Sequence, residues 1–261
     1  MAKKPPRSKI LKTKIMAASP KLTEHIPLTR RLNRQLLSRM LNQYGMVYVK
    51  PDEGAQGKGV IRVEKTKQGY RYQHGMNVPA FADFGSMYAS LRRHIRHKRY
   101  LVQKGVHLLR YNGRPFDFRV MIQRNPKRQW ECTGTFGRLA HPRKAVTNGS
   151  QGGSIYEPSV LLAPHAATGE VSTVRRGMNK LAHWTAARLS RTFPQLNELG
   201  LDIGLDRRLK PWILEVNFYP DPCPFTLLPN PRAIRTIVAY GKAYGRRYRL
   251  KCTKAKRGSL R

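Results

Sequence analysis

The sequence is poor in acidic residues, in cysteine and in long apolar runs. Asp and Glu number 14 against 51 Lys and Arg, in 261 residues. The three cysteines, Cys132, Cys223 and Cys252, are too few for a disulfide framework and have no CxxC spacing, which favours a reducing compartment. No apolar run approaches the ~20 residues of a membrane-spanning helix, and lysines interrupt the N-terminal apolar stretch. We therefore expect a cytoplasmic protein with no membrane span.

The net charge of +37 is the most prominent feature that is present. Such a charge attracts polyanions, including nucleic acid, acidic polymers and nucleotide phosphates. Residues 1–24 and 246–261 are especially basic, and we interpret them as N- and C-terminal basic tails that could bind nucleic acid or another polyanion. A solvated basic surface without a specific partner is the alternative. The 40% of hydrophobic residues excludes a wholly disordered chain.

Hydrophobic periodicity predicts a mixture of helices and antiparallel hairpins, and hence an α+β fold. Helices are expected over residues 28–44, 85–98, 175–193 and 231–244. Strands are expected over residues 46–50, 60–64, 100–103, 116–123, 130–139, 201–205 and 212–216.

Three of the scarce carboxylates, Asp117, Asp202 and Glu215, lie inside apolar strands, where a charge needs a partner. Of these, Asp202 and Glu215 have a further oxygen donor nearby, because Asn217 follows two residues after Glu215. Strand alternation places Glu215, Asn217 and Ile213 on one face and turns the intervening residues toward the core. With Asp202 across from them on the neighbouring strand, this set of oxygen donors suits Mg²⁺. The alternative is that both carboxylates pair with core arginines.

Lys50 ends an apolar strand directly before a glycine-bearing loop, residues 54–59. A lysine there can contact phosphate as a point charge, and glycines let backbone N–H groups approach phosphates closely. The loop is not a Walker A motif, because Gly59 and a strand follow Lys58. Arg119 has the chemistry to bind a carboxylate or phosphate, or else pairs with Asp117 on the same strand face.

The order of these segments resembles the ATP-grasp superfamily, and within it the YheC/YheD-type endospore coat-associated family. The segments are "YLVQKGV", "GRPFDFRVMIQ", "TNGSQGG" and "LDIGLDRRLKPWILEVNFYP", and the resemblance covers roughly residues 25–245. It implies two lobes of mainly antiparallel sheet with helices, which grip a nucleotide between them. The smaller lobe would span about residues 46–103 and the larger about 104–245.

The resemblance also implies ATP and Mg²⁺ as cofactors, and a role for each of several residues. Lys50 and Arg119 would be catalytic, acting on the ATP phosphates and on the terminal phosphate or the substrate carboxylate. The remaining positions are Gln56, Gly57 and Lys58 closing over the phosphates, Gln103, Lys104 and Val106 holding adenine, Asn148 as an accessory ligand, and Asp202, Glu215 and Asn217 holding Mg²⁺.

The activity implied is that of a ligase, which joins a carboxylate to an amine or thiol through an acylphosphate. Its acceptor could be an acidic peptide or polymer, consistent with the charge, and its location could be the spore coat. Gln103 departs from the Glu that many superfamily ligases have at the hinge. The alternative function is a non-catalytic, polyanion-binding structural protein of the spore or nucleoid on a degenerate ATP-grasp scaffold.

Overall fold

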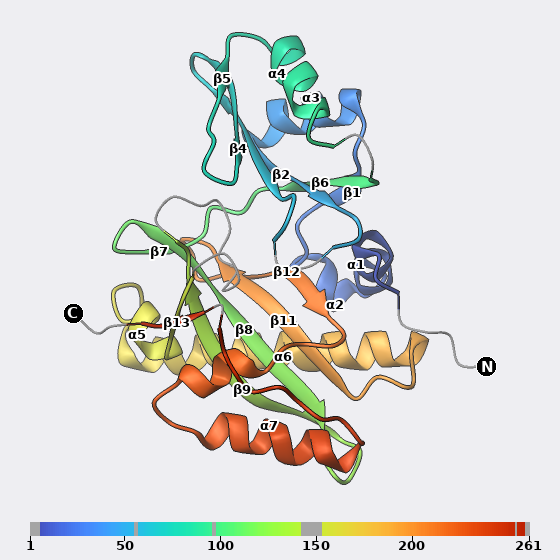
Figure 1. Ribbon diagram of the computed structural model, residues 1–261, viewed down its shortest axis with the longest axis vertical. Helices are drawn as coiled ribbons and strands as arrows, with labels where there is room; N and C mark the ends of the chain where they lie inside the picture. Colours follow the sequence, from blue (N-terminus) through green and yellow to red (C-terminus); the bar gives the residue numbers. More distant parts are fainter. Residues whose placement is uncertain (1–5, 55–56, 96–97, 142–152, 254, 259–261) are drawn as a thin grey trace.

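The computed structural model describes residues 6–54, 57–95, 98–141, 153–253 and 255–258, and these form two lobes (Figure 1). The smaller lobe holds a six-stranded sheet of order β1-β6-β2-β3-β4-β5. The larger lobe holds a sheet of order β12-β11-β8-β9-β10-β13, with β7 paired to β8. Apart from the parallel pair β10–β13, the strand pairs described are antiparallel. The predicted α+β class is confirmed.

The smaller lobe packs helices on one face of its sheet and leaves the other face toward the larger lobe. Its elements are β1 (Thr29–Arg31), α3 (Arg34–Tyr44), β2 (Met46–Pro51), β3 (Ile61–Thr66), β4 (Gly69–His74), β5 (Ala80–Phe81), α4 (Phe84–Arg92) and β6 (Tyr100–Lys104). Helix α3 begins after Asn33, whose side chain accepts from Leu36 N, and ends at Gly45, which has a φ of +69°. The predicted helix 28–44 is therefore shorter, because residues 29–31 pair with β6 instead.

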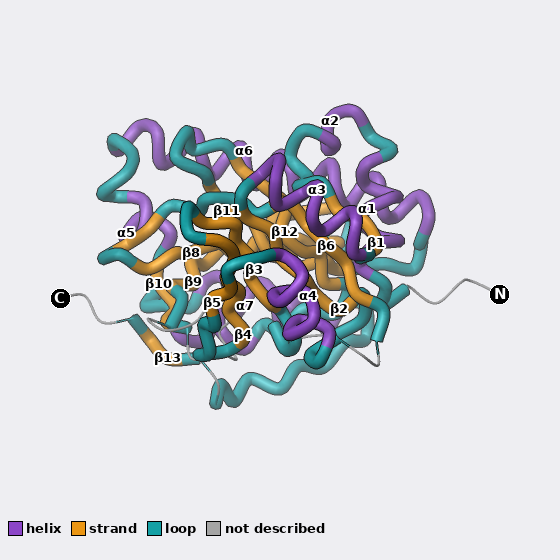
Figure 2. The backbone as a smooth tube through the Cα atoms, turned by 90° about the horizontal axis from the view of Figure 1, so that it is seen from above, coloured by secondary structure: helices purple, strands orange, loops and turns teal. Residues whose placement is uncertain are grey.

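The larger lobe packs its long sheet between helices. Its elements are β7 (Arg110–Tyr111), β8 (Arg114–Arg124), β9 (Trp130–Leu139), β10 (Ser154–Tyr156), α5 (Pro158–Leu162), α6 (Thr168–Thr192), β11 (Glu198–Leu205), β12 (Pro211–Asn217), η2 (Cys223–Leu227), α7 (Arg232–Ala243) and β13 (Lys256–Arg257). Helix α6 crosses one face and α7 covers part of the other (Figure 1). Seen from above, the strands of the two lobes overlie each other in the middle of the molecule (Figure 2).

The N-terminal segment differs from the predicted basic tail. Residues 9–17 and 20–23 form helices α1 (Lys9–Ala17) and α2 (Pro20–Thr23). Ser8 caps α1 by accepting from Leu11 N. Met16 and Leu22 are buried in the core of the larger lobe, and Arg188 of α6 donates to Ile15 O at 2.8 Å. Burial of apolar side chains thus fixes this segment in spite of its charge.

The C-terminal segment is also folded where the sequence predicted a tail. The Tyr248 ring packs against Gly241 of α7, where a Cβ atom would lie only 2.3 Å from the ring. Its hydroxyl group bonds to the buried carboxylate of Glu198. Strand β13 pairs with β10. Among the described residues, helices are too short or too polar to cross a membrane.

Candidate functional site

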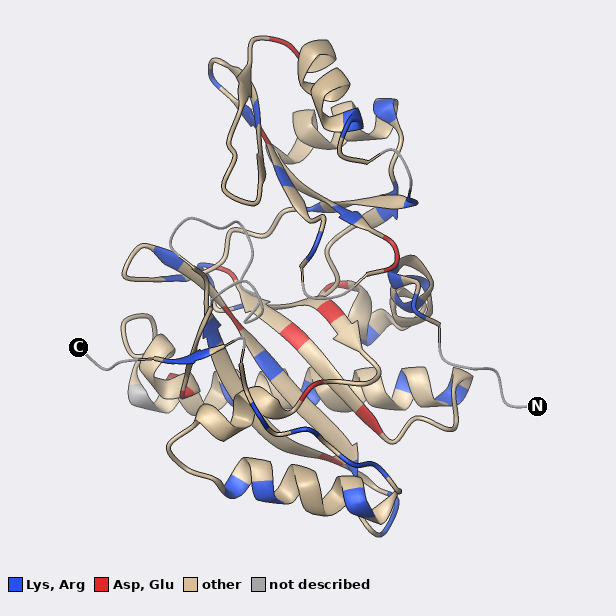
Figure 3. Ribbon diagram, in the orientation of Figure 1, with Lys and Arg blue, Asp and Glu red and all other residues tan. Residues whose placement is uncertain are grey.

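The sheet of the larger lobe carries a row of charged side chains where it faces the smaller lobe. Acidic and basic residues lie next to one another on β8, and acidic residues lie on β11 and β12 beside them (Figure 3). The strand register explains the row, because Arg138 lies opposite Asp117, Arg119 opposite Asp202, and Asp202 opposite Glu215. Side chains of directly opposed residues project to the same side of a sheet. We call this row the cleft floor.

Two arginines neutralise the carboxylates on one side of the cleft floor. Arg138 donates to both oxygens of Asp117, at 2.8 and 2.6 Å, and lies 3.0 Å from Asp202 Oδ2. Arg119 Nε donates to Asp202 Oδ1 at 2.5 Å. Burial opposes ionisation of Asp202, but the charges of Arg119 and Arg138 hold its pKa below the ordinary value. The sequence left two interpretations of Asp202, as a Mg²⁺ ligand or as the partner of core arginines. The structure contains the pairing with arginines.

A β-bulge at Leu214 breaks the regular alternation of side chains that was predicted along β12. Asp202 pairs with Glu215 but Ile203 pairs with Ile213, so Leu214 is an extra residue in the ladder. The parity of the strand therefore changes, and Ile213 and Val216 both enter the core of the larger lobe. The expectation that Ile213 shares the face of Glu215 was wrong. The bulge leaves the Leu214 carbonyl oxygen directed toward Lys50.

The three residues expected to hold Mg²⁺ lie on adjacent strands. Glu215 faces Asp202, and Asn217 faces Gly200. The Glu215 side chain is 24% exposed, whereas both oxygens of Asp202 already contact arginines. Two carboxylates and an amide are oxygen donors of the kind that Mg²⁺ prefers. The donor chemistry fits the metal, with Glu215 and Asn217 the more accessible ligands. The structure contains no cluster of three His, Cys, Asp or Glu in its described part.

Lys50 lies at the junction of the lobes, in contact with both. It is buried, and its Nζ donates to Gln103 Oε1 at 2.8 Å and to Leu214 O at 3.3 Å. Gln103 is itself held by Thr29, whose hydroxyl accepts from Gln103 Nε2 at 2.8 Å. Burial lowers the pKa of Lys50 to about 8, with Lys9 and Lys12 adding to the decrease and Glu215 opposing it.

Helix α1 supplies two further lysines that the sequence analysis missed. Lys12 is buried and its Nζ donates to Val216 O at 2.6 Å. Lys9 Nζ donates to Gly54 O at 2.9 Å and lies 3.6 Å from Glu215 Oε1. Burial lowers the pKa of Lys12 to about 8. The signal that could have revealed them is the spacing of Ile10 and Met16 after a capping Ser8, which predicts a docked helix.

The glycine loop is anchored at its base by α1. Asp52 accepts from Ser8 Oγ and from Ile10 N, at 2.9 Å in each case. Gly57 and Gly59 have φ angles of +68° and +73°, which glycine adopts readily. Lys58 is exposed at the tip. The predicted ligands Gln56 and Asn148 lie outside the described residues.

The linker between the lobes begins after Lys104, the last residue of β6. Lys104 Nζ lies over the rings of Tyr44 and Trp212, at 4.9 and 5.7 Å from their centroids. Gly105 N donates to Met46 O, and a Cβ atom on Gly105 would lie 2.4 Å from the Met46 side chain. Val106 lines a cavity of about 510 Å³ together with Tyr48. Of the described residues predicted to bind nucleotide, Gly57 and Lys58 lie in the glycine loop. The others, Lys50, Gln103, Lys104 and Val106, border this junction.

Comparison with protein families gives one match that spans most of the chain. The family model described as "YheC/D like ATP-grasp" matches residues 4–246. Two curated Bacillus subtilis (strain 168) proteins are similar. "Endospore coat-associated protein YheD" is 28% identical over 195 residues, 71% of this chain and 42% of its own. "Endospore coat-associated protein YheC" is 23% identical over 210 residues, 76% of this chain and 56% of its own. The chain thus spans about half the length of these relatives.

Solved structures with the same fold include two synthetases. D-cycloserine synthetase DcsG has a TM-score of 0.56 and 13% identity, covering 91% of this chain and 70% of its own. Carboxyaminoimidazole ribonucleotide synthase from Aspergillus clavatus, complexed with ATP, has a TM-score of 0.52 and 10% identity, covering 81% of this chain and 44% of its own. At these identities the likeness shows the fold alone, and it confirms the ATP-grasp architecture.

Proposed function

Because the chain belongs to the YheC/D-like ATP-grasp family, we propose that it binds ATP and Mg²⁺ between its lobes. We further propose that it uses the nucleotide to join a carboxylate to an amine or a thiol. The two curated relatives, YheD and YheC, are both named endospore coat-associated proteins. The reaction that we propose for this chain comes from its own site residues.

The observation that carries the proposal is the convergence of three lysines on three consecutive residues of β12, Leu214 to Val216. Lys50 and Lys12 donate to the carbonyl oxygens of Leu214 and Val216, and Lys9 lies beside the intervening Glu215. The three ammonium groups gather around Glu215 in a buried place. Asp202 and Asp52 also attract Lys12, but Asp202 is already paired with Arg119 and Arg138. Buried charges require partners, and the phosphate chain of a nucleotide would supply them. Lys9 Nζ also donates to Gly54 O, which joins this cluster to the start of the glycine loop.

The cleft floor supplies the groups that act on the reacting end. Glu215, Asn217 and Asp202 would hold Mg²⁺, whose chemistry is to neutralise phosphate oxygens during transfer. Arg119, oriented by its bond to Asp202, would meet the terminal phosphate or the substrate carboxylate. Formation of an acylphosphate needs no protein nucleophile, because positioning and charge neutralisation suffice.

Other residues would bind the rest of the nucleotide. Gln103, Lys104 and Val106 would contact the base, with Lys58, Gly57 and Gln56 over the phosphates and Asn148 as an accessory ligand.

Thermal unfolding with and without MgATP in high salt tests nucleotide binding. High salt screens non-specific attraction to the net charge of +37. Ligand at 100 times its dissociation constant contributes about 2.7 kcal/mol, which corresponds to roughly 5–10 °C at this size. We expect Glu215→Gln and Lys50→Ala to remove the Mg²⁺-dependent shift, and the exposed Glu131→Gln to keep it. A full shift in both cleft variants would contradict the site.

The substrate and setting follow from charge and from relatives. We propose that the acceptor is an acidic peptide or polymer, which a basic cleft would attract. By analogy with YheD and YheC, we propose that the protein acts in the cytoplasm of a spore-forming cell or in association with its spore coat. ADP or phosphate release that depends on an added acidic peptide, and is lost in Arg119→Met, would support this. Release that is indifferent to every acidic acceptor would count against it.

A second candidate function is polyanion binding without catalysis. The observation that favours it is Asp202, whose two oxygens are both taken by arginines rather than left for a metal. Nucleic acid binding through basic surfaces would weaken by about one log unit per log of salt for each phosphate neutralised. A steep salt dependence combined with no MgATP shift would favour this candidate over the ligase.

A further inference from the structure

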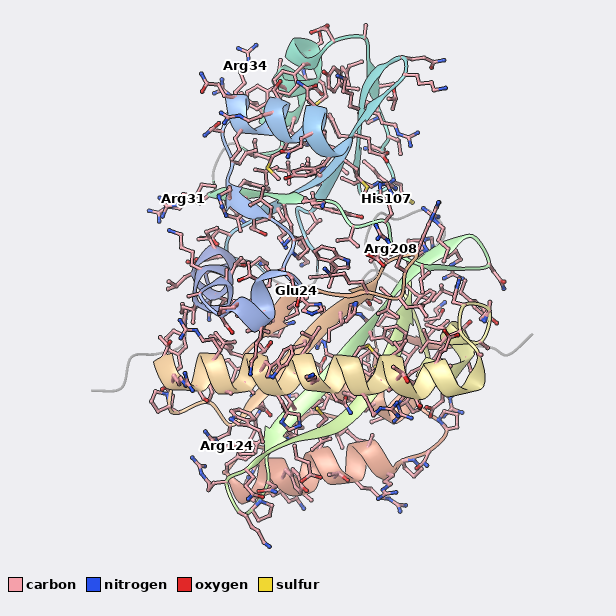
Figure 4. All side chains as sticks on the ribbon, turned by 180° about the vertical axis from the view of Figure 1, so that it is seen from behind. Glu24, Arg31, Arg34, His107, Arg124 and Arg208 are labelled. Carbon is pink, nitrogen blue, oxygen red and sulfur yellow. The ribbon has the colours of Figure 1, made fainter. Side chains whose placement is uncertain are left out.

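The cavity at the linker is bordered by both lobes. Tyr48 of β2 and Arg62 of β3 line it from the smaller lobe, and Arg110, Arg114 and Arg207 line it from the larger. Figure 4 places His107, on the linker, and Arg208, beside Arg207 on the β11–β12 turn, at the junction of the lobes. The cavity has a volume of about 510 Å³, which lies within the range of small-molecule sites.

The cavity and the proposed phosphate site at Lys50 lie along the same strand, β2, and Val106 of the proposed base site lines the cavity. Tyr48 and Met46 precede Lys50 by two and four residues on the same strand face, so they lie about 7 and 13 Å from it along β2. Val106, Leu108 and Met46 provide apolar contacts for a base. The phosphate end at Lys50 and the cavity are thus separated by a span that one nucleotide can bridge.

The rim of the cavity is strongly positive, and its arginines are held by neutral groups. Arg110 Nη1 donates to Gly113 O at 2.5 Å, and Arg114 Nε donates to Ala140 O at 2.7 Å. These bonds orient the guanidinium groups without neutralising them. Arg207 is exposed on the turn. We call Arg110, Arg114 and Arg207 the arginine rim.

Nearby carboxylates are engaged elsewhere. The described lining of the cavity contains no Asp or Glu. Glu64 is shared between Arg62 and Arg71. Asp206, adjacent to Arg207 in sequence, accepts from Trp212 Nε1 at 3.0 Å and from backbone N–H groups of its own turn. The charge of the arginine rim is therefore left for a ligand.

A base and a ribose carry no charge, so ATP alone would leave the arginine rim without a partner. Guanidinium groups held in place bind phosphate with two parallel hydrogen bonds. We propose that the arginine rim is a second anion subsite, which binds a phosphate group carried on the ribose of the bound nucleotide. This inference rests on the proposed nucleotide site and refines its ligand from ATP itself to an ATP-type nucleotide that also carries a phosphate on its ribose.

The test compares two ligands that differ by one phosphate. AMP and adenosine 3′,5′-bisphosphate compete with a fluorescent ATP analogue for the full-length protein at constant high ionic strength. We expect the bisphosphate to compete about tenfold or more better than AMP, the gain of one or two charge-assisted hydrogen bonds. The Arg110→Gln/Arg114→Gln variant should reduce this ratio to about twofold or less.

Two further variants keep the result interpretable. Arg207→Gln changes an exposed turn residue, so it should fold normally and lower the same ratio. Arg175→Gln/Arg176→Gln removes two exposed charges from α6 and should leave the ratio unchanged. Equal competition by the two ligands in the wild type, or a ratio that survives in the rim variants, would overturn the inference alone. Failure of the ATP analogue to bind would overturn the nucleotide site and this subsite together.

Discussion

Lys12 and Val216 lie 204 residues apart in the sequence, and Lys12 Nζ donates to the Val216 carbonyl oxygen at 2.6 Å. The same ammonium group lies 5.1 Å from the centroid of the Phe218 ring. This pair fastens α1 to the edge strand of the larger lobe, while Ser8 fastens the same helix to Asp52 at the glycine loop. Helix α1 is therefore a structural part of the cleft and holds a positive charge inside it.

The first prediction concerns that charge. Lys12→Met keeps the length of the side chain but removes the ammonium group, so we expect ATP affinity to fall about tenfold, the value of one charge-assisted hydrogen bond. The control is Lys14→Met, which changes an exposed lysine on the same helix. Calorimetric titration with MgATP measures both variants. Equal losses for the two would mean that only the net charge matters.

The second prediction concerns pH. Burial lowers the pKa values of Lys50 and Lys12 to about 8, so above that pH the unliganded protein increasingly holds them neutral. Phosphate binds the charged form, and ATP affinity should therefore fall above pH 8, by up to about tenfold per pH unit for each lysine. Titrations between pH 7 and 9.5 measure this. A constant affinity across that range would contradict the contact.

The stability of the unliganded protein should change with pH in the opposite direction. A lysine whose pKa is lowered on folding binds fewer protons in the folded state than in the unfolded state. The free energy of unfolding should thus rise between pH 8 and the ordinary lysine value of 10.5. Lys12→Met should reduce this rise, which chemical denaturation at several pH values would reveal.

Much of the fold could be predicted from the sequence, because the periodicity of apolar residues along its strands is clear. The hairpin of β8 and β9 follows from residues 116–123 and 130–139, and the closing hairpin from Asp202 and Glu215 in apolar strands. The predicted approach of Asp202 to Glu215 agrees with their register. These features depend on local periodicity, which one sequence contains in full.

Other features depend on contacts that local patterns do not contain. The bulge at Leu214 changes the parity of β12, and no residue type there signals it. Helix α1 was not predicted, because its lysines suggested a basic tail. The burial of Met16 in the core of the larger lobe holds the helix in place. The pairing of Asp202 with Arg119 and Arg138 needs the three-strand register, so the sequence left the alternatives open.

The third prediction concerns the cleft floor. Arg138→Met leaves Asp117 buried without its principal cation, and breaking a buried ion pair costs about 3–5 kcal/mol. We expect the melting temperature to fall by roughly 10 °C. Arg175→Met, at an exposed position, should change it little. The double variant Arg138→Met/Asp117→Leu should recover part of the loss, and a double variant less stable than Arg138→Met would contradict this account.

The fourth prediction concerns the C-terminal segment, which the sequence suggested to be a tail. Tyr248 and Tyr244 both donate to Glu198 Oε2, and Gln123 Nε2 contacts the two hydroxyl groups at 3.2 and 2.6 Å. Tyr248→Phe removes one donor from a buried carboxylate, at a cost of about 1–3 kcal/mol. Tyr240, whose hydroxyl donates to Glu131 in a solvent-exposed hydrogen bond, provides the matched Tyr240→Phe control. Denaturant unfolding should separate the two variants clearly, because only the first leaves a buried acceptor with a missing partner. If residues 246–261 were merely a tail, both variants and the truncation before Arg246 would unfold like the wild type.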